Sequence, residues 1–225
     1  MYFDSTMLLL IPAILFALWA QTRVKSTYAK YSKEFAGLTG AEAARMVLEM
    51  NGVNDVTIEP VAGELTDHFD PQTNTIRLSK GVYNVTSVAA VGIAAHEAGH
   101  AVQYAVGYSP IKLRTAIIPV TNIGSTLSWP LLLIGLMLGS ETLAMAGVLL
   151  FCAVVAFQLI TLPVEFDASR RAVRILSDKG YLTASETTQA KAVLRAAALT
   201  YVSGFVLSLL QLVRLMALFG GRRRR

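Results

Sequence analysis

The stretch Ala94-Ala95-His96-Glu97-Ala98-Gly99-His100-Ala101 organises the rest of the chain. It lies in a run of small apolar residues, from about Ser87 to Val106, that contains no proline and only two glycines. A run of this length and composition predicts a buried helix, and Thr86 or Ser87 would provide a good N-cap for it. The polar side chains of the stretch are therefore expected to project from a helix that is otherwise almost wholly apolar.

His96 and His100 are four residues apart, so on a helix both imidazoles project from one face and can hold one metal ion. Glu97 is one position round the helix, where its carboxylate can accept a proton from metal-bound water. This is the H-E-x-x-H arrangement of zinc peptidases, in which neutral imidazoles suit zinc and an open coordination position holds water. The chain has only three histidines, and two of them fall at this spacing where unpaired polar groups would be costly. We therefore interpret the motif as a zinc site.

The composition indicates a membrane protein. Of the 225 residues, 54% are hydrophobic, and the mean hydropathy of +0.51 exceeds that of ordinary soluble proteins. The single cysteine, Cys152, excludes a disulfide framework and a thiolate metal site. The net charge of +5 comes partly from Arg222–Arg225, and nothing else in the chain suggests a nucleic-acid-binding face.

The first apolar run predicts an N-terminal transmembrane anchor over residues 1–22. A signal peptide would carry its positive charge before the apolar core, whereas here the only side-chain charge ahead of the core is Asp4. The basic residues that follow the core are Arg23, Lys25, Lys30 and Lys33. Because basic flanks favour the cytoplasmic side, we expect the chain to enter the cytoplasm after this anchor.

Two further apolar runs, residues 116–139 and 142–162, are joined by a very short turn and predict a transmembrane hairpin over residues 116–162. A last apolar segment, residues 201–225, has the composition of either a fourth span or a helix lying at the interface. We favour an interfacial or re-entrant segment, because a span would place Arg222–Arg225 outside, against the positive-inside tendency.

Residues 23–115 are expected to form a cytoplasmic region that holds a small sheet and the metal helix. Thr39 and Glu42 have the spacing of a capping box at the start of a short helix. The predicted strands are residues 56–61, 65–70 and 75–79, the last two forming a hairpin. Residues 163–200 predict a further cytoplasmic helical region. The expected fold is mainly α with a small β-sheet.

The motif itself leaves the third zinc ligand open. A metzincin pattern would need glycine at position 103 and histidine at position 106, but the chain has Gln103 and Val106, so that pattern is excluded. The remaining candidates are Glu165, Asp167, His68 and the acidic residues near His68. A hairpin returns the chain to the membrane side that it left, so Glu165 emerges on the same side as the two motif histidines.

Three segments together resemble the YugP-type neutral zinc metallopeptidases of bacterial membranes, and the similarity covers essentially the whole chain. They are Leu65–Pro71, the HEAGHAVQ run from His96 to Gln103, and Glu165–Arg171. More distantly, the chain resembles the membrane gluzincins of the HtpX and CAAX prenyl protease class. There, a glutamate after a membrane hairpin is the third zinc ligand, in a Glu-aromatic-x-Ala-Asp pattern. The resemblance implies Glu165 as the third ligand.

The match to the distant pattern is incomplete. Glu165, Phe166 and Ala168 fit it, but Ser169 stands where the pattern has its aspartate. In that class the aspartate supports a ligand histidine. Asp167 cannot simply replace it, because two residues along a helix place a side chain on a different face.

The resemblance implies a membrane-bound, gluzincin-like zinc metalloendopeptidase, in which the two motif histidines and Glu165 hold Zn²⁺ and Glu97 acts as general base. His68 is expected to donate a hydrogen bond to the tetrahedral oxyanion, with Tyr201 and Arg195 as rivals for that role. The expected substrate is a peptide or a membrane protein at the cytoplasmic face of the bacterial inner membrane.

The alternative function is a zinc-containing membrane scaffold or regulatory protein that cleaves nothing. A closed site with His68 as fourth ligand would favour that alternative, whereas the carboxylate of Glu97 beside the ligands argues against it. A transporter is disfavoured because the predicted anchor and the two arms of the predicted hairpin carry little charge. The lipid bilayer and the substrate are the expected partners, and the sequence leaves the oligomeric state open.

Overall fold

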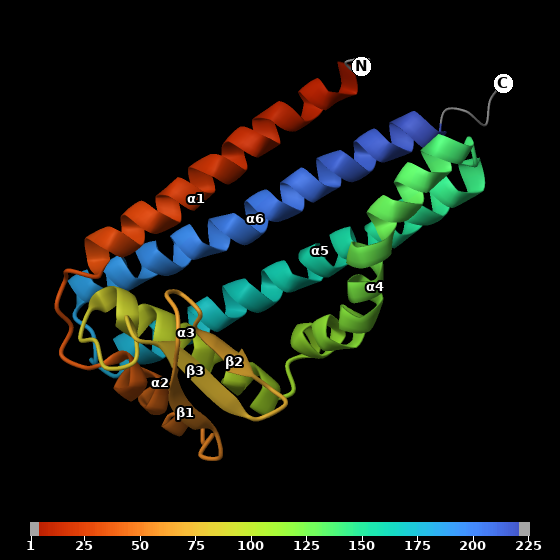
Figure 1. Ribbon diagram of the computed structural model, residues 1–225. Helices are drawn as coiled ribbons and strands as arrows, with labels where there is room; N and C mark the ends of the chain where they lie inside the picture. The colour runs from red at the N-terminus through yellow and green to blue at the C-terminus, as the bar shows by residue number, and fades with distance from the viewer. Residues whose placement is uncertain (1–4, 221–225) are drawn as a thin grey trace. The chain divides into compact units, whose positions relative to one another are not determined.

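The computed structural model describes residues 5–220, so Asp4 and Arg222–Arg225 lie outside the described residues. Its elements in chain order are a 3₁₀ helix (Ser5–Leu10), α1 (Ile11–Tyr31), α2 (Gly40–Glu49), β1 (Thr57–Val61), β2 (His68–Asp70), β3 (Thr75–Ser79), α3 (Val88–Ala105), α4 (Ser109–Leu138), α5 (Glu141–Asp178) and α6 (Ala184–Gly220) (Figure 1). The chain is therefore mainly helical with one small sheet, as the sequence predicts.

The chain divides into two compact units. The sheet unit comprises Gln21–Lys112 and Pro163–Leu199, and the helical unit comprises Met1–Ala20, Leu113–Leu162 and Thr200–Arg225. Every site residue expected from the sequence belongs to the sheet unit, except Tyr201.

The sheet has three strands in the order β1-β3-β2, with β1 parallel and β2 antiparallel to β3. The predicted hairpin is present as β2 and β3, and Asp70 stabilises its turn by accepting hydrogen bonds from the Gln72 backbone N–H at 2.9 Å and the Thr73 hydroxyl at 2.8 Å. Asn74 ends the turn with φ 51°, a left-handed conformation that asparagine tolerates better than most residues. Both β1 and β2 are edge strands.

α2 and α3 both begin at N-caps that the sequence predicts. Thr39 and Glu42 form a complete capping box at the start of α2. Ser87 caps α3 by accepting a hydrogen bond from the Ala90 backbone N–H at 3.2 Å.

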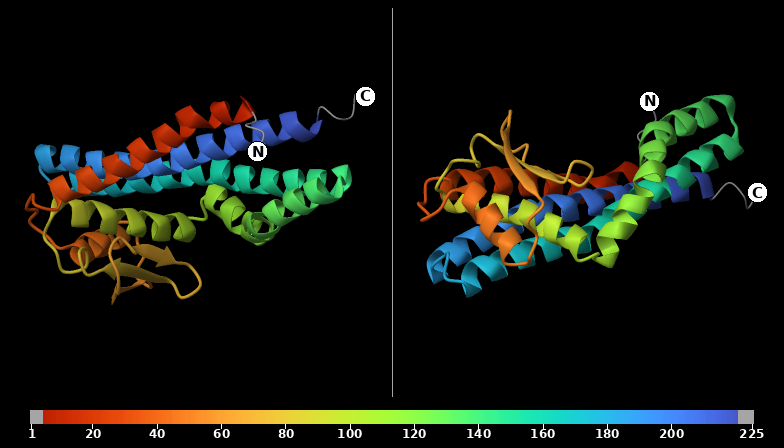
Figure 2. Two further views of the ribbon diagram at one scale, coloured as in Figure 1. Left: turned by 45° about the horizontal axis from the view of Figure 1, so that its top comes forward. Right: turned by 90° about the horizontal axis from the view of Figure 1, so that it is seen from below.

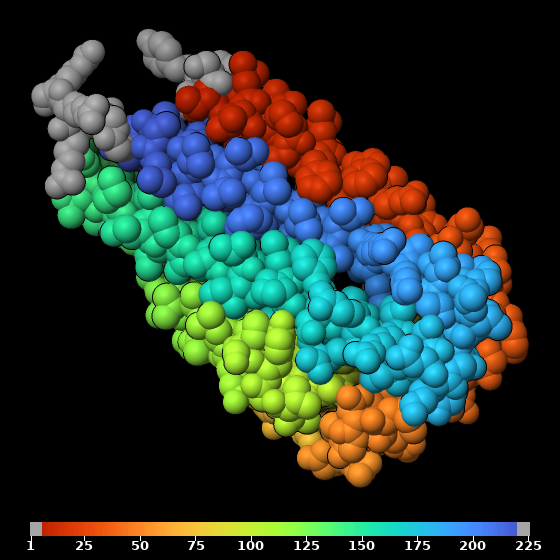
Figure 3. Space-filling model, turned by 180° about the vertical axis from the view of Figure 1, so that it is seen from behind, coloured from red at the N-terminus to blue at the C-terminus, as the bar shows by residue number. Residues whose placement is uncertain are grey.

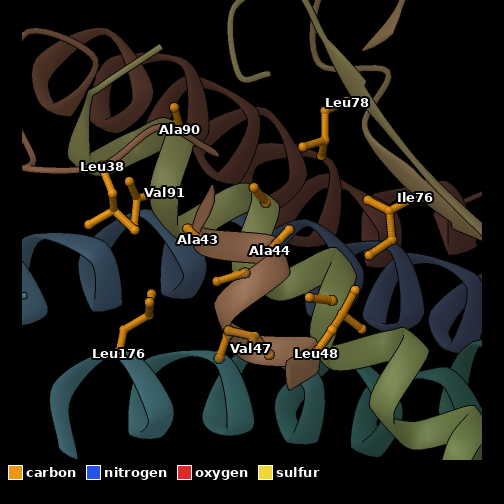
Figure 4. Close-up of a cluster of buried hydrophobic side chains, with 14 of the residues drawn as sticks. Leu38, Ala43, Ala44, Val47, Leu48, Ile76, Leu78, Ala90, Val91 and Leu176 are labelled. Atoms are coloured by element: carbon orange, nitrogen blue, oxygen red, sulfur yellow. The ribbon is translucent and has the colours of Figure 1, made fainter. Parts of the chain in front are cut away.

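One hydrophobic core joins these elements (Figure 4). Val47 and Leu48 of α2, Ile76 of β3 and Val91 of α3 are fully buried in it, and Leu176 contributes from α5. Many of the remaining core positions of α3 are alanines, so the elements packed against α3 approach its backbone closely. The predicted buried helix is therefore the centre of the sheet unit.

The strand register decides which face of the sheet each side chain occupies. Phe69 is paired with Ile76, and both belong to the hydrophobic core on the face that α3 covers. His68 is paired with Arg77, whose guanidinium forms ion pairs with Glu59 and Asp70, each at 2.8 Å. Directly paired residues lie on the same face and successive residues alternate, so His68 lies on the opposite face from Phe69.

Among residues 5–220, four helices are long enough and apolar enough to cross a membrane. Their residue ranges are Thr6–Tyr31, Ser109–Leu138, Glu141–Asp178 and Ala184–Phe219. Within the helical unit, α1 lies beside α6 (Figures 2 and 3), and Arg214 donates a hydrogen bond to the hydroxyl of Thr6 at 3.1 Å. α4 carries Pro119 and Pro130 and changes direction along its length (Figure 2), as prolines within a helix cause.

Two boundaries differ from those expected. α5 continues through Pro163 to Asp178, so Glu165 lies within a helix that began in the hairpin. α6 is one helix from Ala184 to Gly220, whereas the sequence predicted a helix to about Thr200 and a separate apolar segment after it. α6 has no break among its described residues, and a continuous helix can either cross a membrane or lie at its interface, so the position of the last segment stays a prediction. The stretch contains no proline that would end the helix.

Candidate metal centre

α3 presents its two motif histidines side by side. The ring centroids of His96 and His100 lie 4.6 Å apart with an edge-to-face orientation. His100 is buried and His96 is half-buried. One imidazole therefore lies inside the sheet unit while the other keeps some access to solvent.

α5 comes unusually close to α3 beside these histidines. A Cβ built on Gly99 would lie only 2.6 Å from the carbonyl oxygen of Ala168, so the contact accepts no larger residue without a backbone shift. Glu165 lies one turn before Ala168 on α5 and has a relative exposure of only 2%. The helix contact thus places a buried carboxylate next to the two imidazoles.

The three side chains converge on one point. Oε2 of Glu165 lies 3.2 Å from Nε2 of His96 and 3.5 Å from Nε2 of His100. Their ligand atoms all lie within 4.8 Å of one another, and within residues 5–220 no other group of three His, Cys, Asp or Glu side chains meets that condition. Of the four candidates for a third ligand, the structure brings Glu165 to the histidines.

The spacing of these donors fits one zinc ion. Zinc lies about 2.0–2.2 Å from imidazole nitrogen and carboxylate oxygen, so two ligands at a tetrahedral angle lie about 3.3 Å apart. The separations of 3.2 and 3.5 Å are close to that value. Among the described residues the group contains three donors, which leaves a position for water in a tetrahedral site.

The side-chain amide of Gln103 lies beside Nδ1 of His100. Nε2 of Gln103 donates to two acceptors, the Val164 carbonyl and the Asp167 carboxylate, each at 2.9 Å. Its Oε1 therefore faces Nδ1 of His100, at 3.0 Å, and accepts a hydrogen bond from it. In the neutral imidazole Nε2 then keeps its lone pair, which points toward Glu165. A lone pair facing a carboxylate favours a cation between them.

The electrostatics of the group also favour a cation. Burial lowers the pKa of His100, but its hydrogen bond to Glu165 and the charges of Glu97 and Glu165 outweigh burial, so the net shift of the pKa is upward. The site therefore stabilises positive charge between the imidazoles and the carboxylate. A zinc ion held there would supply that charge without protonation of the imidazoles.

The other motif histidine, His96, contacts Ser169 of α5. The Ser169 hydroxyl lies 3.1 Å from Nδ1 of His96, where its oxygen can accept a hydrogen bond from Nδ1–H and leave the Nε2 lone pair for a metal. Ser169 is the residue that departs from the distant gluzincin pattern, in which an aspartate stands at this position. The Ser169 hydroxyl therefore lies beside His96 at the position where that pattern has a carboxylate.

Glu97 lies beside the donor group without belonging to it. Its Oε2 accepts a hydrogen bond of 3.0 Å from the backbone N–H of Phe69, on the edge strand β2. The Phe69 ring packs against Tyr104 of α3, which holds the strand to the helix. Burial raises the pKa of the Glu97 carboxyl, although His96 and His100 act in the opposite direction. A raised pKa suits a group that must take up a proton near neutral pH.

The structure does not bring His68 into the donor group. Its side chain is exposed, lies on the face of the sheet away from α3, and has Nδ1 2.7 Å from the Thr66 carbonyl oxygen. This placement favours neither the fourth-ligand role nor the oxyanion role. Of its two rivals, Arg195 is exposed on α6 and Tyr201 belongs to the helical unit.

Asp167, the other candidate ligand, contacts the site indirectly. It accepts a hydrogen bond from Gln103 and forms an ion pair with Arg171 at 2.5 Å. Gln103 excludes a metzincin pattern and ends the HEAGHAVQ run, but the sequence predicted no contact for its side chain. The available signal was its type and place: an amide in an apolar helix, one turn after a ligand histidine, must find partners when it is buried.

The fold and the site define a class of protein, and comparison with known sequences agrees with them. Residues 6–220 match the family described as "Putative neutral zinc metallopeptidase", and the chain belongs to that family. Zinc is the metal of this family, and His96, His100 and Glu165 are the residues that fit it here.

A relative in that family is the "Putative membrane protease YugP" of Bacillus subtilis (strain 168). It is 47% identical over 213 residues, which cover 94% of this chain and 95% of the relative. No solved structure matches this chain. With four apolar helices among residues 5–220 and a relative described as "Putative membrane protease YugP", the chain is a membrane protein.

Proposed function

We propose that this protein is a membrane-bound zinc endopeptidase of the gluzincin type. The observation that carries the proposal is the convergence of His96, His100 and Glu165 within 4.8 Å, beside the carboxylate of Glu97. A zinc ion held there would polarise the scissile carbonyl and activate a water molecule. A scaffold without activity would not need a carboxylate with a raised pKa next to three metal donors.

Glu97 is the general base in this proposal. It accepts a proton from the attacking water as the water oxygen bonds to the carbonyl carbon. It then donates that proton to the amine nitrogen as the peptide bond breaks. The N–H of Phe69 orients the carboxylate by its hydrogen bond to Oε2. Gln103 and Ser169 orient the two imidazoles by their contacts with Nδ1.

The substrate is proposed to be a peptide or a membrane protein in extended conformation. β2 is an edge strand, and its residue Phe69 contacts the proposed base directly. Extended peptides bind to free sheet edges through backbone hydrogen bonds, so a segment beside β2 would lie next to Glu97. The membrane spans would keep such substrates close to the bilayer.

The location is proposed to be the bacterial inner membrane, with the site on the cytoplasmic side. α1 is the N-terminal anchor, and α4 with the first part of α5 forms the membrane hairpin between the H-E-x-x-H helix and Glu165. Basic residues follow the anchor and precede the hairpin, as they do on cytoplasmic flanks.

The decisive experiment separates metal binding from chemistry. In the full-length protein purified in detergent, Glu97→Gln is expected to keep its zinc and to lower kcat by about a hundredfold or more, because an amide cannot accept the proton. Glu49→Gln, the same exchange at an exposed position of α2, serves as the control and should change neither quantity. Zinc is measured by elemental analysis and turnover with casein. Full turnover in Glu97→Gln would contradict the proposed base.

A further inference from the structure

Gln103 is a fully buried polar side chain that connects the two helices carrying the metal donors. Its relative exposure is 0%, and its three hydrogen bonds go to His100 on α3 and to Val164 and Asp167 on α5. The bond to Val164 is made to the residue that directly precedes Glu165. One amide thus touches a ligand histidine and holds the backbone beside the ligand carboxylate.

The far end of this chain of contacts is also anchored. Asp167 is held by the guanidinium of Arg171, one turn along α5. That guanidinium in turn lies over the ring of Tyr108, 5.6 Å from its centroid. A carboxylate held in this way offers a fixed acceptor, so the amide of Gln103 has only one orientation that satisfies all its partners.

We propose that Gln103 is a positioning residue that fixes His100 in the metal-binding tautomer, with Asp167 as the group that orients the amide. The proposal rests on the zinc site of the proposed function and concerns metal affinity, whether or not the bound metal hydrolyses peptides. Without the amide, Nδ1 of His100 would face no acceptor in a buried site. The tautomer of His100 with its lone pair on Nε2 would then no longer be favoured over the tautomer with its lone pair on Nδ1.

The first test removes the amide while keeping the length of the side chain. Gln103→Met is expected to raise the zinc dissociation constant by about 10–100-fold, the usual effect of losing a hydrogen-bond partner of a ligand histidine. Gln189→Met, the same exchange at a partly buried glutamine of α6 in the same unit, is the matched control and should leave the constant unchanged. The constant is measured on the purified full-length protein by competition with a chromophoric chelator.

The second test distinguishes orientation from simple packing. Gln103→Glu places a carboxylate against Asp167 and should weaken zinc binding by about tenfold or more. In the double variant with Asp167→Asn, the side-chain amide introduced at position 167 can donate a hydrogen bond to the carboxylate introduced at position 103. That carboxylate still faces Nδ1 of His100. The double variant is therefore expected to bind zinc more tightly than Gln103→Glu alone, which a general packing defect would not allow.

Wild-type zinc affinity in both Gln103→Met and Gln103→Glu would overturn the proposal. If Gln103→Met does not fold, as judged by circular dichroism, the double variant decides, and no recovery there would overturn the proposal as well. Failure of the proposed function gives a different result, namely zinc binding that depends on Gln103 in a protein that cleaves no peptide.

Discussion

At the scale of single residues, the site depends on how the buried carboxylate of Glu165 is compensated by the imidazoles of His96 and His100. Glu165 is buried, and a buried carboxylate is stable only if a charge or hydrogen bonds compensate it. The imidazoles of His96 and His100 can compensate it by becoming protonated or by sharing a cation with it. Because Gln103 and Ser169 occupy the two Nδ1 positions, the Nε2 atoms are left for the cation.

The corresponding prediction contrasts two residues that the sequence treated as rivals. Glu165→Ala is expected to lose most of the bound zinc, because two imidazoles alone make a weak site. His68→Ala should retain both zinc and turnover, because His68 is exposed on the far face of the sheet. Metal content and casein hydrolysis of the two purified variants are compared with the wild type. Full zinc in Glu165→Ala together with metal loss in His68→Ala would reverse the assignment.

At the scale of elements, the distance between α3 and α5 sets the geometry of the metal centre. The H-E-x-x-H motif places its histidines on α3, and the third donor comes from α5, so the site exists only where these helices touch. Gly99 permits that contact, because its missing side chain leaves room for the backbone of Ala168. The edge strand β2 adds the backbone N–H of Phe69, which orients Glu97.

Gly99→Ala should therefore disturb the metal centre without changing any of the proposed ligands. The added methyl would lie 2.6 Å from a backbone oxygen, so α3 and α5 must separate, and we expect a loss of about 1–3 kcal/mol in stability together with weaker zinc binding. Gly204→Ala is the matched control, because a Cβ there meets nothing within 4 Å and alanine favours a helix. Thermal unfolding followed by circular dichroism, with and without zinc, measures the stabilities. Equal stability and zinc affinity in Gly99→Ala and the wild type would show that the contact is not needed.

At the scale of the whole molecule, the membrane segments determine which compartment the metal centre reaches. In the described part of the chain, four helices are long and apolar enough to cross a membrane, and the segment between the first two carries the sheet and α3. The basic residues on either side of this region, Arg23 to Lys33 and Lys112 to Arg114, favour the cytoplasm. A site in the cytoplasm would restrict cleavage to membrane proteins and peptides on that side.

Cysteine labelling tests this orientation in intact cells. Gln72 lies exposed in the turn between β2 and β3, so a cysteine introduced there by Gln72→Cys is accessible on whichever side the sheet lies. In a Cys152→Ser background, an impermeant thiol reagent should label it only after the cells are lysed. Labelling of intact cells at the level seen in lysates would place the sheet outside and contradict the orientation.

The parts of the fold that depend on neighbouring residues could be predicted from the sequence. The capping box of Thr39 and Glu42, the N-cap at Ser87 (one of the two expected candidates) and the hairpin turn between β2 and β3 rest on local hydrogen bonds, and each lies where the sequence predicts it. The spacing of His96 and His100 placed both on one helical face for the same reason, since a helix repeats every 3.6 residues. Long apolar runs likewise predicted most of the candidate spans.

Tertiary structure alone decided the features that depend on residues far apart in the chain. The sequence could not show which face His68 takes, because the face follows from the register of β2 against β3. It could not reveal that Gln103 reaches Val164 and Asp167, because hydrogen-bond partners of a buried amide depend on which helix packs against it. The meeting of Glu165 with the two histidines has the same origin. Local chemistry determined the helices and their caps, and only the packing of α5 on α3 brought the donors of one metal centre within reach of each other.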